Sequence, residues 1–314
     1  MLLVPPMAPE LAEAVAASYR TVELPVEDRA AFLAEHGAEV VAVVCSNFGA
    51  VDRDLIATLP RLQMIANHGV GYDNLDLDAC RDRGIVASNT PEVLDDAVAE
   101  LALALLLAVR RHVVAADRFV RRGDWERGPF PLTAQVAGSR VGILGLGRVG
   151  QAVATRVEAF GAQVSYHNRR PAAGVAYPYY DSAVALAAAV DALIVVVPGG
   201  DSTRGLVDTD VLAALGADGV LINIARGEVV DEDALIAALD AGTLGGAGLD
   251  VYRDEPRVPS ALIEREDVVL LPHVGSGTHV TRAAMRRLTV DNLGAWMAGG
   301  PLLTPVPELD PTSA

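Results

Sequence analysis

Short apolar runs alternate with amphipathic stretches along the whole chain. The apolar runs are rich in valine and isoleucine, and they occupy residues 40–45, 63–67, 140–144, 163–167, 192–198, 219–225, 246–252 and 268–272. Between them lie stretches with the polar and apolar spacing of helices, such as 152–160 and 232–240. Strands of this kind that alternate with helices form parallel sheets with right-handed crossovers. The pattern therefore predicts an α/β protein.

The same alternation predicts two sheets. A glycine-rich turn follows the run at 140–144, and the long segment before it has its own strand and helix alternation. The helical stretch 91–122 is expected to bridge two domains, and the last helix, 278–297, to return to the first. We predict two Rossmann-like or flavodoxin-like parallel-sheet domains with a cleft between them. Residues 92–279 form the inner domain, inserted into an outer domain of residues 1–91 and 280–314.

The amino-acid composition excludes several classes of binding protein and enzyme. The net charge of −16 argues against a nucleic-acid-binding surface, because attraction to phosphates needs a basic face. All 25 basic residues are arginine, and the chain has no lysine. Schiff-base catalysis, the lysine of phosphate-binding loops and the lysine-dependent dehydrogenases of the short-chain and β-hydroxyacid classes are thereby excluded. The chemistry must use histidine, arginine and carboxylates.

The cysteines and the apolar segments predict a cytoplasmic protein. Cys45 and Cys80 are too few for a disulfide framework and lack metal-ligand spacing, so we expect a reducing compartment and no metal. The start, "MLLVPPMAPE", has no basic region of a signal peptide. The most apolar window, 98–109, falls short of the roughly 20 residues of a membrane span. We interpret it as a buried helix at a domain or subunit interface.

A glycine fingerprint indicates a dinucleotide site. "GLGRVG" lies between the run 140–144 and the helix-forming "QAVATRVEAF". The first glycine allows a tight turn, the second lets the backbone approach a pyrophosphate, and the third packs the helix on the strand. The helix N-terminus offers amide hydrogens to the anion. We expect the whole turn to contact the cofactor: Gly145, Leu146, Gly147, Arg148, Val149 and Gly150.

The segment "SYHNRRP" decides which cofactor is expected. An acidic residue usually follows the second strand of such a fold and binds the ribose of NAD. Here Asn168, Arg169 and Arg170 occupy that place. A 2′-phosphate attracts arginine, which binds it through two hydrogen bonds, so the segment favours NADPH. NADH, with the arginines as ordinary loop charges, is the alternative.

Three segments that each follow a predicted strand carry candidate catalytic groups. They are "INIARGEVV" with Arg226, "LDVYRDEP" with Asp250 and Glu255, and "LLPHVGSGT" with His273. Ligands of α/β sheets bind at the carboxyl ends of the strands. An arginine, an acid and a histidine at three successive strand ends would bind an oxyanion and donate a proton.

His273 is the best candidate acid among the histidines. It lies between a proline and a glycine-rich turn, at a strand end. The others are expected in less suitable places: His36 and His112 in helices, His167 in the cofactor loop and His279 at the start of the last helix.

At these residues the chain resembles the D-isomer-specific 2-hydroxyacid dehydrogenases over nearly its whole length. The run "GVLINIARGEVVDEDALIAALDAGTLGGAGLDVYRDEP" resembles two signatures of that family. "HVGSGT", "VAYPYYDS" and "LLTPVPE" are similar to the NADPH-dependent hydroxypyruvate/glyoxylate reductases within it. The glutamate in "DEP" disfavours the formate dehydrogenases of this superfamily, which have glutamine there.

The resemblance implies a role for each candidate. Arg226 binds the substrate carboxylate and polarises the keto group, and His273 also contacts the substrate and delivers the proton. Glu255 holds the imidazole and favours its charged form. "NHGVGYDN" resembles the substrate-domain loop whose backbone amides, at Val70 and Gly71, bind the same carboxylate.

The resemblance also implies further cofactor contacts. Asp250 matches the position that faces the nicotinamide ring, and Ile224 and Ala225 match the backbone beside it. "VVVPGGDST" departs from the commoner Pro-Leu-Thr-type stretch, which puts the contacts made there in doubt. The remaining expected contacts are Val197, Pro198, Thr203 and Gly275.

The predicted function is NADPH-preferring reduction of a small 2-keto acid, glyoxylate or hydroxypyruvate, to the D-hydroxy acid. We expect a substrate-binding outer domain, an NAD(P)-binding inner domain, no membrane partner, and a homodimer paired through helix 98–109. The resemblance implies that Phe130 reaches the neighbouring active site. Two alternatives stay open: a family member acting on phosphoglycerate or a larger keto acid, and a dinucleotide-sensing corepressor that binds proteins.

Overall fold

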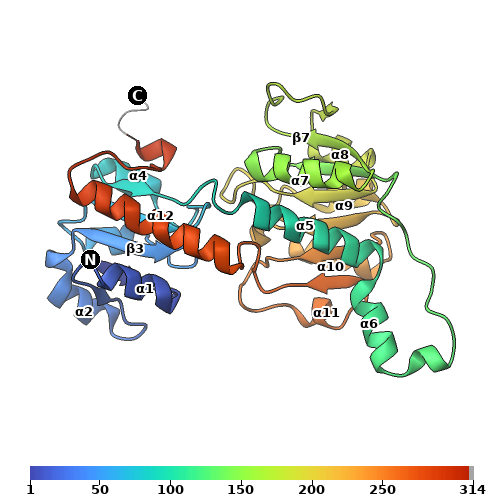
Figure 1. Cartoon of the computed structure of the whole chain (residues 1–314), viewed down its shortest axis with the longest axis horizontal. Helices are drawn as coiled ribbons and strands as arrows, with labels where there is room; N and C mark the ends of the chain where they lie inside the picture. The colour runs from blue at the N-terminus through green and yellow to red at the C-terminus, as the bar shows by residue number, and fades with distance from the viewer. Residues whose placement is uncertain (311–314) are drawn as a thin grey trace. The chain divides into compact units, whose positions relative to one another are not determined.

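The computed structural model describes residues 1–310, and these divide into two compact units (Figure 1). One unit consists of Met1–Leu94 together with the chain from Thr278 onward, and the other is Asp95–Gly277. Each unit has its own fully parallel sheet with helices on both faces. The predicted α/β class with two parallel-sheet domains is confirmed.

The first unit is built on a five-stranded sheet in the order β2-β1-β3-β4-β5. This is a doubly wound order of the flavodoxin type. Its strands are β1 (Leu2–Val4), β2 (Val22–Glu23), β3 (Ala42–Ser46), β4 (Met64–His68) and β5 (Val86–Ser88). Its helices are α1 (Pro9–Ala16), α2 (Arg29–His36), α3 (Arg53–Ala57), α4 (Leu77–Asp82) and α12 (His279–Met297), with short 3-10 turns at Gly37–Glu39 and Pro307–Leu309.

The last helix completes the core of the first unit. Figure 1 shows α12 and α1 on the same face of the five-stranded sheet. On that face Leu293 is fully buried against Val15 and Met64. The opposite face is closed partly by the C-terminal segment, where Val306 and Leu309 are buried. Both ends of the chain are therefore needed to bury the core of this unit.

The second unit is built on a seven-stranded sheet in the order β12-β11-β10-β9-β6-β7-β8. The strand order reverses between β6 and β9, which is the switch point where such sheets bind nucleotides. Its strands are β6 (Arg140–Leu144), β7 (Gln163–His167), β8 (Tyr179–Tyr180), β9 (Ala192–Val195), β10 (Val220–Asn223), β11 (Gly246–Leu249) and β12 (Val268–Leu270). Its helices are α5 (Asp95–Arg110), α6 (Val113–Arg121), α7 (Arg148–Ala159), α8 (Ala183–Ala188), α9 (Thr209–Leu215), α10 (Glu232–Asp240) and α11 (Ser260–Ile263), with 3-10 turns at Asp124–Glu126 and Gly227–Val229.

Helix α5 packs one side against the sheet of its own unit. Its apolar side covers β10 and β11, and Leu105 and Val109 are buried there. Two glycines of β11 allow this close approach: a Cβ at Gly248 would lie 3.2 Å from the Cβ of Leu105. The other side of α5 keeps Leu101 partly exposed and Ala104 exposed, so pairing of two subunits through the window 98–109 stays a prediction. None of the helices within residues 1–310 has both the length and the apolar composition to cross a membrane.

The predicted helical stretch 91–122 is two helices. It begins only at Asp95, and it breaks at residues 111–112, where His112 adopts a left-handed φ of 49°. His112 therefore precedes α6 instead of lying within a helix, which corrects its predicted place. Four short strands, β1, β2, β5 and β8, were not predicted.

His68 is a buried histidine at the end of β4. Only 4% of it is exposed, and its Nδ1 lies 3.1 Å from the Thr289 hydroxyl of α12. That hydroxyl already donates to the carbonyl of Met285, so we assign the Nδ1 proton to the histidine. Burial, reinforced by the nearby charges of Arg282 and Arg286, lowers the pKa of His68 to about 4.

We expect His68 to make the free energy of unfolding depend on pH. His68 is protonated below about pH 6.5 in the unfolded chain but only below about pH 4 in the folded chain. The free energy of unfolding is therefore highest above pH 6.5 and decreases as the pH falls toward 4, because protonation favours the unfolded chain. At pH 5 the loss is about 2 kcal/mol. Chemical unfolding of His68→Phe at pH 7 and pH 5 should show a correspondingly smaller pH effect than the parent. An equal pH effect in both proteins would contradict this, and His36→Phe is the control.

Candidate active site

The glycine turn has the shape that a dinucleotide needs. Gly145 has a φ of 106°, and a Cβ there would lie 2.8 Å from the backbone nitrogen of Val197. A Cβ at Gly150 would collide with the carbonyl oxygen of Gly145. At Gly147, by contrast, a Cβ would meet no protein atom within 4 Å. The first and third glycines therefore serve the fold, whereas the second leaves its open side to a ligand.

Helix α7 begins at this turn without a side-chain cap. Gly147 is its N-cap residue, so no side chain accepts a hydrogen bond from the first amides of this 12-residue helix. Amides at a helix N-terminus bind the oxygens of phosphate groups. Arg148, the first helical residue, forms an ion pair with Asp95 at 3.5 Å. The turn fits a pyrophosphate, held by backbone amides and without a lysine.

The three residues after β7 differ in what they contact. The side-chain oxygen of Asn168 accepts a hydrogen bond from the backbone amide of Leu146 at 2.7 Å, which ties the loop to the glycine turn. Arg169 and Arg170 are exposed, and within residues 1–310 neither forms an ion pair. Most other exposed arginines in this acidic chain lie beside a carboxylate. Two guanidiniums next to the turn are thus left for an anionic ligand.

The loop after β9 lies across the switch point from the glycine turn. Val197 contacts Gly145, as described above, and the Thr203 hydroxyl donates to the carbonyl of Pro198 at 2.7 Å. Gly200 donates its amide to the carboxylate of Glu228 at 3.0 Å. Hydrogen bonds within the loop and to the segment after β10 therefore fix the conformation of the loop. Its cofactor contacts stay predictions.

Arg226 lies just after β10, in a backbone that is tightly fixed. Asn223 accepts a hydrogen bond from the amide of Ala225 and donates one to the carbonyl of Arg226, at 3.1 and 2.9 Å. A Cβ at Gly227 would overlap the backbone of Tyr252, so this segment packs directly on the one that follows β11. Ile224 and Ala225 are buried beside it.

His273 and Glu255 form a hydrogen-bonded pair. The imidazole Nδ1 lies 2.7 Å from Oε2 of the glutamate, and both side chains are 20% exposed. The other glutamate oxygen accepts the backbone amide of Tyr252 at 3.0 Å, which fixes the carboxylate. With Nδ1 bonded to a carboxylate, the imidazole can exchange a proton with a substrate through its second ring nitrogen.

Asp250 holds the backbone that carries His273. Its carboxylate accepts the amides of Val274 and Gly275, each at 2.8 Å, and its carbonyl accepts the amide of His273. His273 has a left-handed φ of 53°, a strained conformation that these three bonds impose. Burial raises the pKa of Asp250, although the two amides act in the opposite direction. The sequence analysis did not predict the bonds from the Asp250 carboxylate to the amides of Val274 and Gly275. The one indication in the sequence was an acidic residue at the end of an otherwise apolar run.

The second unit thus brings the catalytic candidates together. Arg226, Glu255 and His273 follow β10, β11 and β12, which are neighbours in the sheet. Val70 and Gly71 lie in the first unit, in the loop after β4. Within the described part of the chain, no group of three or more histidine, cysteine or acidic side chains could hold a metal ion.

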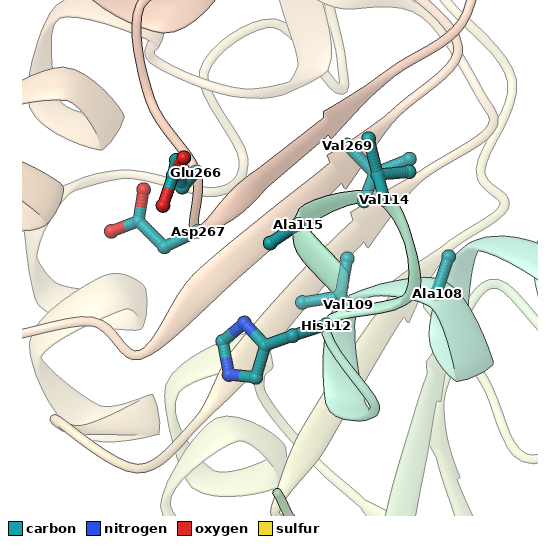
Figure 2. A pocket seen from close by; sticks show the side chains of 8 residues that line it. All are labelled: Ala108, Val109, His112, Val114, Ala115, Glu266, Asp267 and Val269. Carbon is teal, nitrogen blue, oxygen red and sulfur yellow. The ribbon is translucent and has the colours of Figure 1, made fainter. Parts of the chain in front are cut away.

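A small hollow in the second unit lies away from these residues. It is a shallow depression between the α5–α6 turn and the start of β12 (Figure 2). None of the catalytic or cofactor candidates lines it, so we assign it no part in the chemistry. Its lining residues are Ala108, Val109, His112, Val114, Ala115, Glu266, Asp267 and Val269.

Comparison with known proteins agrees with this geometry. Residues 103–275 match the family model described as "D-isomer specific 2-hydroxyacid dehydrogenase, NAD binding domain". This range covers the glycine turn and the ends of β10, β11 and β12.

Relatives match the chain over nearly its full length. A glyoxylate/hydroxypyruvate reductase A of Arabidopsis thaliana is 48% identical over 279 residues, 89% of each chain. A hydroxyphenylpyruvate reductase of Plectranthus scutellarioides is 49% identical over 275 residues, 88% of each chain.

A solved structure extends the match to the fold. It is an NADPH-dependent glyoxylate/hydroxypyruvate reductase of Sinorhizobium meliloti, in complex with NADP and malonate. It is 45% identical, with a TM-score of 0.93 over 98% of this chain and 96% of that one. The chain therefore belongs to the D-isomer-specific 2-hydroxyacid dehydrogenases and is an NAD(P)-dependent oxidoreductase of that family.

Proposed function

We propose that the protein reduces small 2-keto acids, glyoxylate and hydroxypyruvate first among them, to D-2-hydroxy acids with a preference for NADPH. The hydrogen-bonded His273–Glu255 pair in the same unit as the glycine turn carries this proposal. The activities named for the Arabidopsis and Sinorhizobium relatives support the choice of substrate. In this assignment the second unit binds the dinucleotide and the first unit helps to bind the keto acid.

The chain's own residues account for the rest of the chemistry. NADPH, when bound, supplies a hydride to the keto carbon. Arg226 binds the substrate carboxylate and draws electron density toward the keto oxygen. His273 gives its proton to that oxygen as negative charge develops there. Glu255 stabilises the protonated imidazole until the transfer, and Asp250 keeps the imidazole in place through the backbone.

The cofactor preference rests on Arg169 and Arg170. Each is exposed and lacks an acidic partner in the described chain, and both follow the strand that precedes the ribose position of such folds. Guanidinium groups bind a 2′-phosphate through paired hydrogen bonds. NADH remains a usable but weaker cofactor in this proposal.

Steady-state turnover over a panel of 2-keto acids tests the function. We expect the highest kcat/KM with glyoxylate or hydroxypyruvate and with NADPH. Higher kcat/KM with hydroxyphenylpyruvate would place the chain with the relative from Plectranthus. A preference for oxidation of phosphoglycerate would favour the first alternative from the sequence. Dinucleotide binding with no turnover on any substrate would favour the corepressor-like alternative.

The enzyme is also proposed to be a cytoplasmic homodimer. The dimer surface is placed on α6 and the segment after it, where four large apolar side chains are exposed: Val113, Val120, Trp125 and Leu132. Phe130 lies in the same segment and packs edge-on against Phe119 of its own chain, with ring centroids 5.3 Å apart. An exposed apolar surface of this kind is buried by pairing of identical subunits. Cys45 and Cys80 are both buried and unpaired, which accords with a reducing compartment.

Light scattering at micromolar concentration should give twice the chain mass. The double substitution Trp125→Glu and Leu132→Glu should shift the mass toward that of a monomer, because it places charges in the apolar contact. A monomer mass for the parent would reject the dimer. A parent dimer unchanged by these substitutions would place its contact elsewhere.

A further inference from the structure

Three consecutive carbonyl groups follow β4, and each accepts a hydrogen bond from a side-chain amide. The side-chain amide of Asn67 donates to the carbonyl of Gly71 at 2.8 Å and, more weakly, to that of Gly69 at 3.4 Å. The side-chain amide of Asn89 donates to the carbonyl of Val70 at 2.9 Å. Both asparagines are buried, with 1% and 7% exposed. The loop is therefore held from the inside of the first unit.

These bonds fix the direction of two backbone amides. In a trans peptide the N–H points opposite to the carbonyl of the preceding residue. The Gly69 carbonyl, held also by the amide of Thr90 at 2.9 Å, sets the N–H of Val70. The Val70 carbonyl sets the N–H of Gly71 in the same way. Within residues 1–310 neither of these N–H groups has an acceptor. The loop presents two aligned donors, which is an arrangement that binds anions.

Asn89 is the most sensitive residue of this arrangement, because within residues 1–310 it is the only one that donates a hydrogen bond to the Val70 carbonyl. Its own backbone is fixed by the C-terminal segment: the Thr304 hydroxyl donates to the Asn89 carbonyl at 2.7 Å. The Asn89 amide donates to the Thr304 carbonyl at 3.2 Å. Asn292 of α12, fully buried, donates to the Thr304 hydroxyl at 2.9 Å. A continuous hydrogen-bonded path thus runs from α12 through Thr304 and Asn89 to the loop.

We infer that Asn89 is a positioning residue that aims the Gly71 amide at the substrate carboxylate, and that Thr304 supports it. The inference rests on the proposed function, because it assigns this loop the carboxylate of the keto acid. A carboxylate binds the two amides as strongly before hydride transfer as during it. Loss of the alignment should therefore raise the KM of the keto acid and leave kcat nearly unchanged.

The test compares Asn89→Ala and Thr304→Val with the parent enzyme. We expect Asn89→Ala to raise the KM for glyoxylate about tenfold or more, and Thr304→Val to raise it by less. For both variants kcat and the Kd of NADPH should stay within twofold of the parent. Titration calorimetry with malonate in the presence of NADP should show the same loss of affinity, and it needs no turnover.

Thr58→Val is the matched control for Thr304→Val. Thr58 lies in the first unit, and its hydroxyl donates to the carbonyl of Leu55 at 2.7 Å, outside the loop and the residues that hold it. The substitution should leave the KM for glyoxylate and the affinity for malonate unchanged.

The outcomes separate this inference from the proposed function. Unchanged malonate affinity and unchanged KM in Asn89→Ala would overturn the inference. A rise of KM in Thr58→Val equal to that in Thr304→Val would also overturn it, as would a parent that does not bind malonate. If Asn89→Ala fails to fold, Thr304→Val decides on the same measurements. A parent that binds malonate but reduces no keto acid would reject the function alone.

Discussion

His273→Ala is expected to lose turnover by about 10²–10⁴-fold while it still binds NADPH, because a general acid contributes a factor of that size. NADPH affinity should persist, since the glycine turn and the loop after β7 are separate from His273 in the sequence and are fixed by their own contacts. The measurement is single-turnover reduction of glyoxylate together with NADPH fluorescence titration. His36→Ala, which removes a histidine from α2, should behave as the parent. Retention of more than a tenth of parent turnover would remove His273 from the mechanism.

Glu255→Gln separates the two members of the pair. Glutamine can keep the hydrogen bond to Nδ1 of His273 but does not supply the negative charge beside the ring. We expect kcat for glyoxylate to fall about tenfold or more, by less than in His273→Ala, while the affinity for NADPH is kept. Steady-state kinetics and NADPH fluorescence titration measure both quantities. A kcat equal to that of the parent would mean that Glu255 only holds the ring in position.

Substitution of both Arg169 and Arg170 by alanine is expected to raise the KM for NADPH at least tenfold and to leave the KM for NADH nearly unchanged. Each charge-assisted bond to a 2′-phosphate contributes about 1.5–3 kcal/mol, and NADH has no group to receive it. Steady-state kinetics with both cofactors at saturating glyoxylate measures this.

A double variant elsewhere controls for the lost charge. Arg29→Ala with Arg61→Ala removes two exposed arginines from the first unit and should change neither KM. Equal losses for NADPH and NADH in the Arg169 and Arg170 variant would place these arginines outside the phosphate site.

The sequence predicted long, regular elements well and short ones poorly. The run at 140–144 became β6, and the pattern at 232–240 became α10 with the same bounds. β2 and β8 have two residues each, too few to show any alternation. The break at His112 has no proline or glycine to announce it. Contacts between distant segments determine these short strands and this helix break, and the local sequence pattern does not indicate them.

Those residues of the candidate site that directly follow a strand were predictable from the sequence. Arg226, Glu255 and His273 could be located because each follows an apolar run, and the resemblance gave them roles. Asn89 could not be located in this way, because its proposed positioning role depends on the Val70 carbonyl, 19 residues away, and on Thr304, which is distant in the sequence. The side of α5 that packs on the sheet could not be located for a related reason, because the glycines that make room for it belong to β11.

The discontinuous first unit has a consequence for synthesis on the ribosome. Its core lacks Leu293, Val306 and Leu309 until synthesis has passed residue 309, whereas the second unit is one continuous segment, Asp95–Gly277. Domains fold as units during translation, usually in order from the N-terminus. Here the middle of the chain can fold before the beginning does. The nascent N-terminal segment, with its apolar strands uncovered, must wait for α12 and is the part most in need of a chaperone.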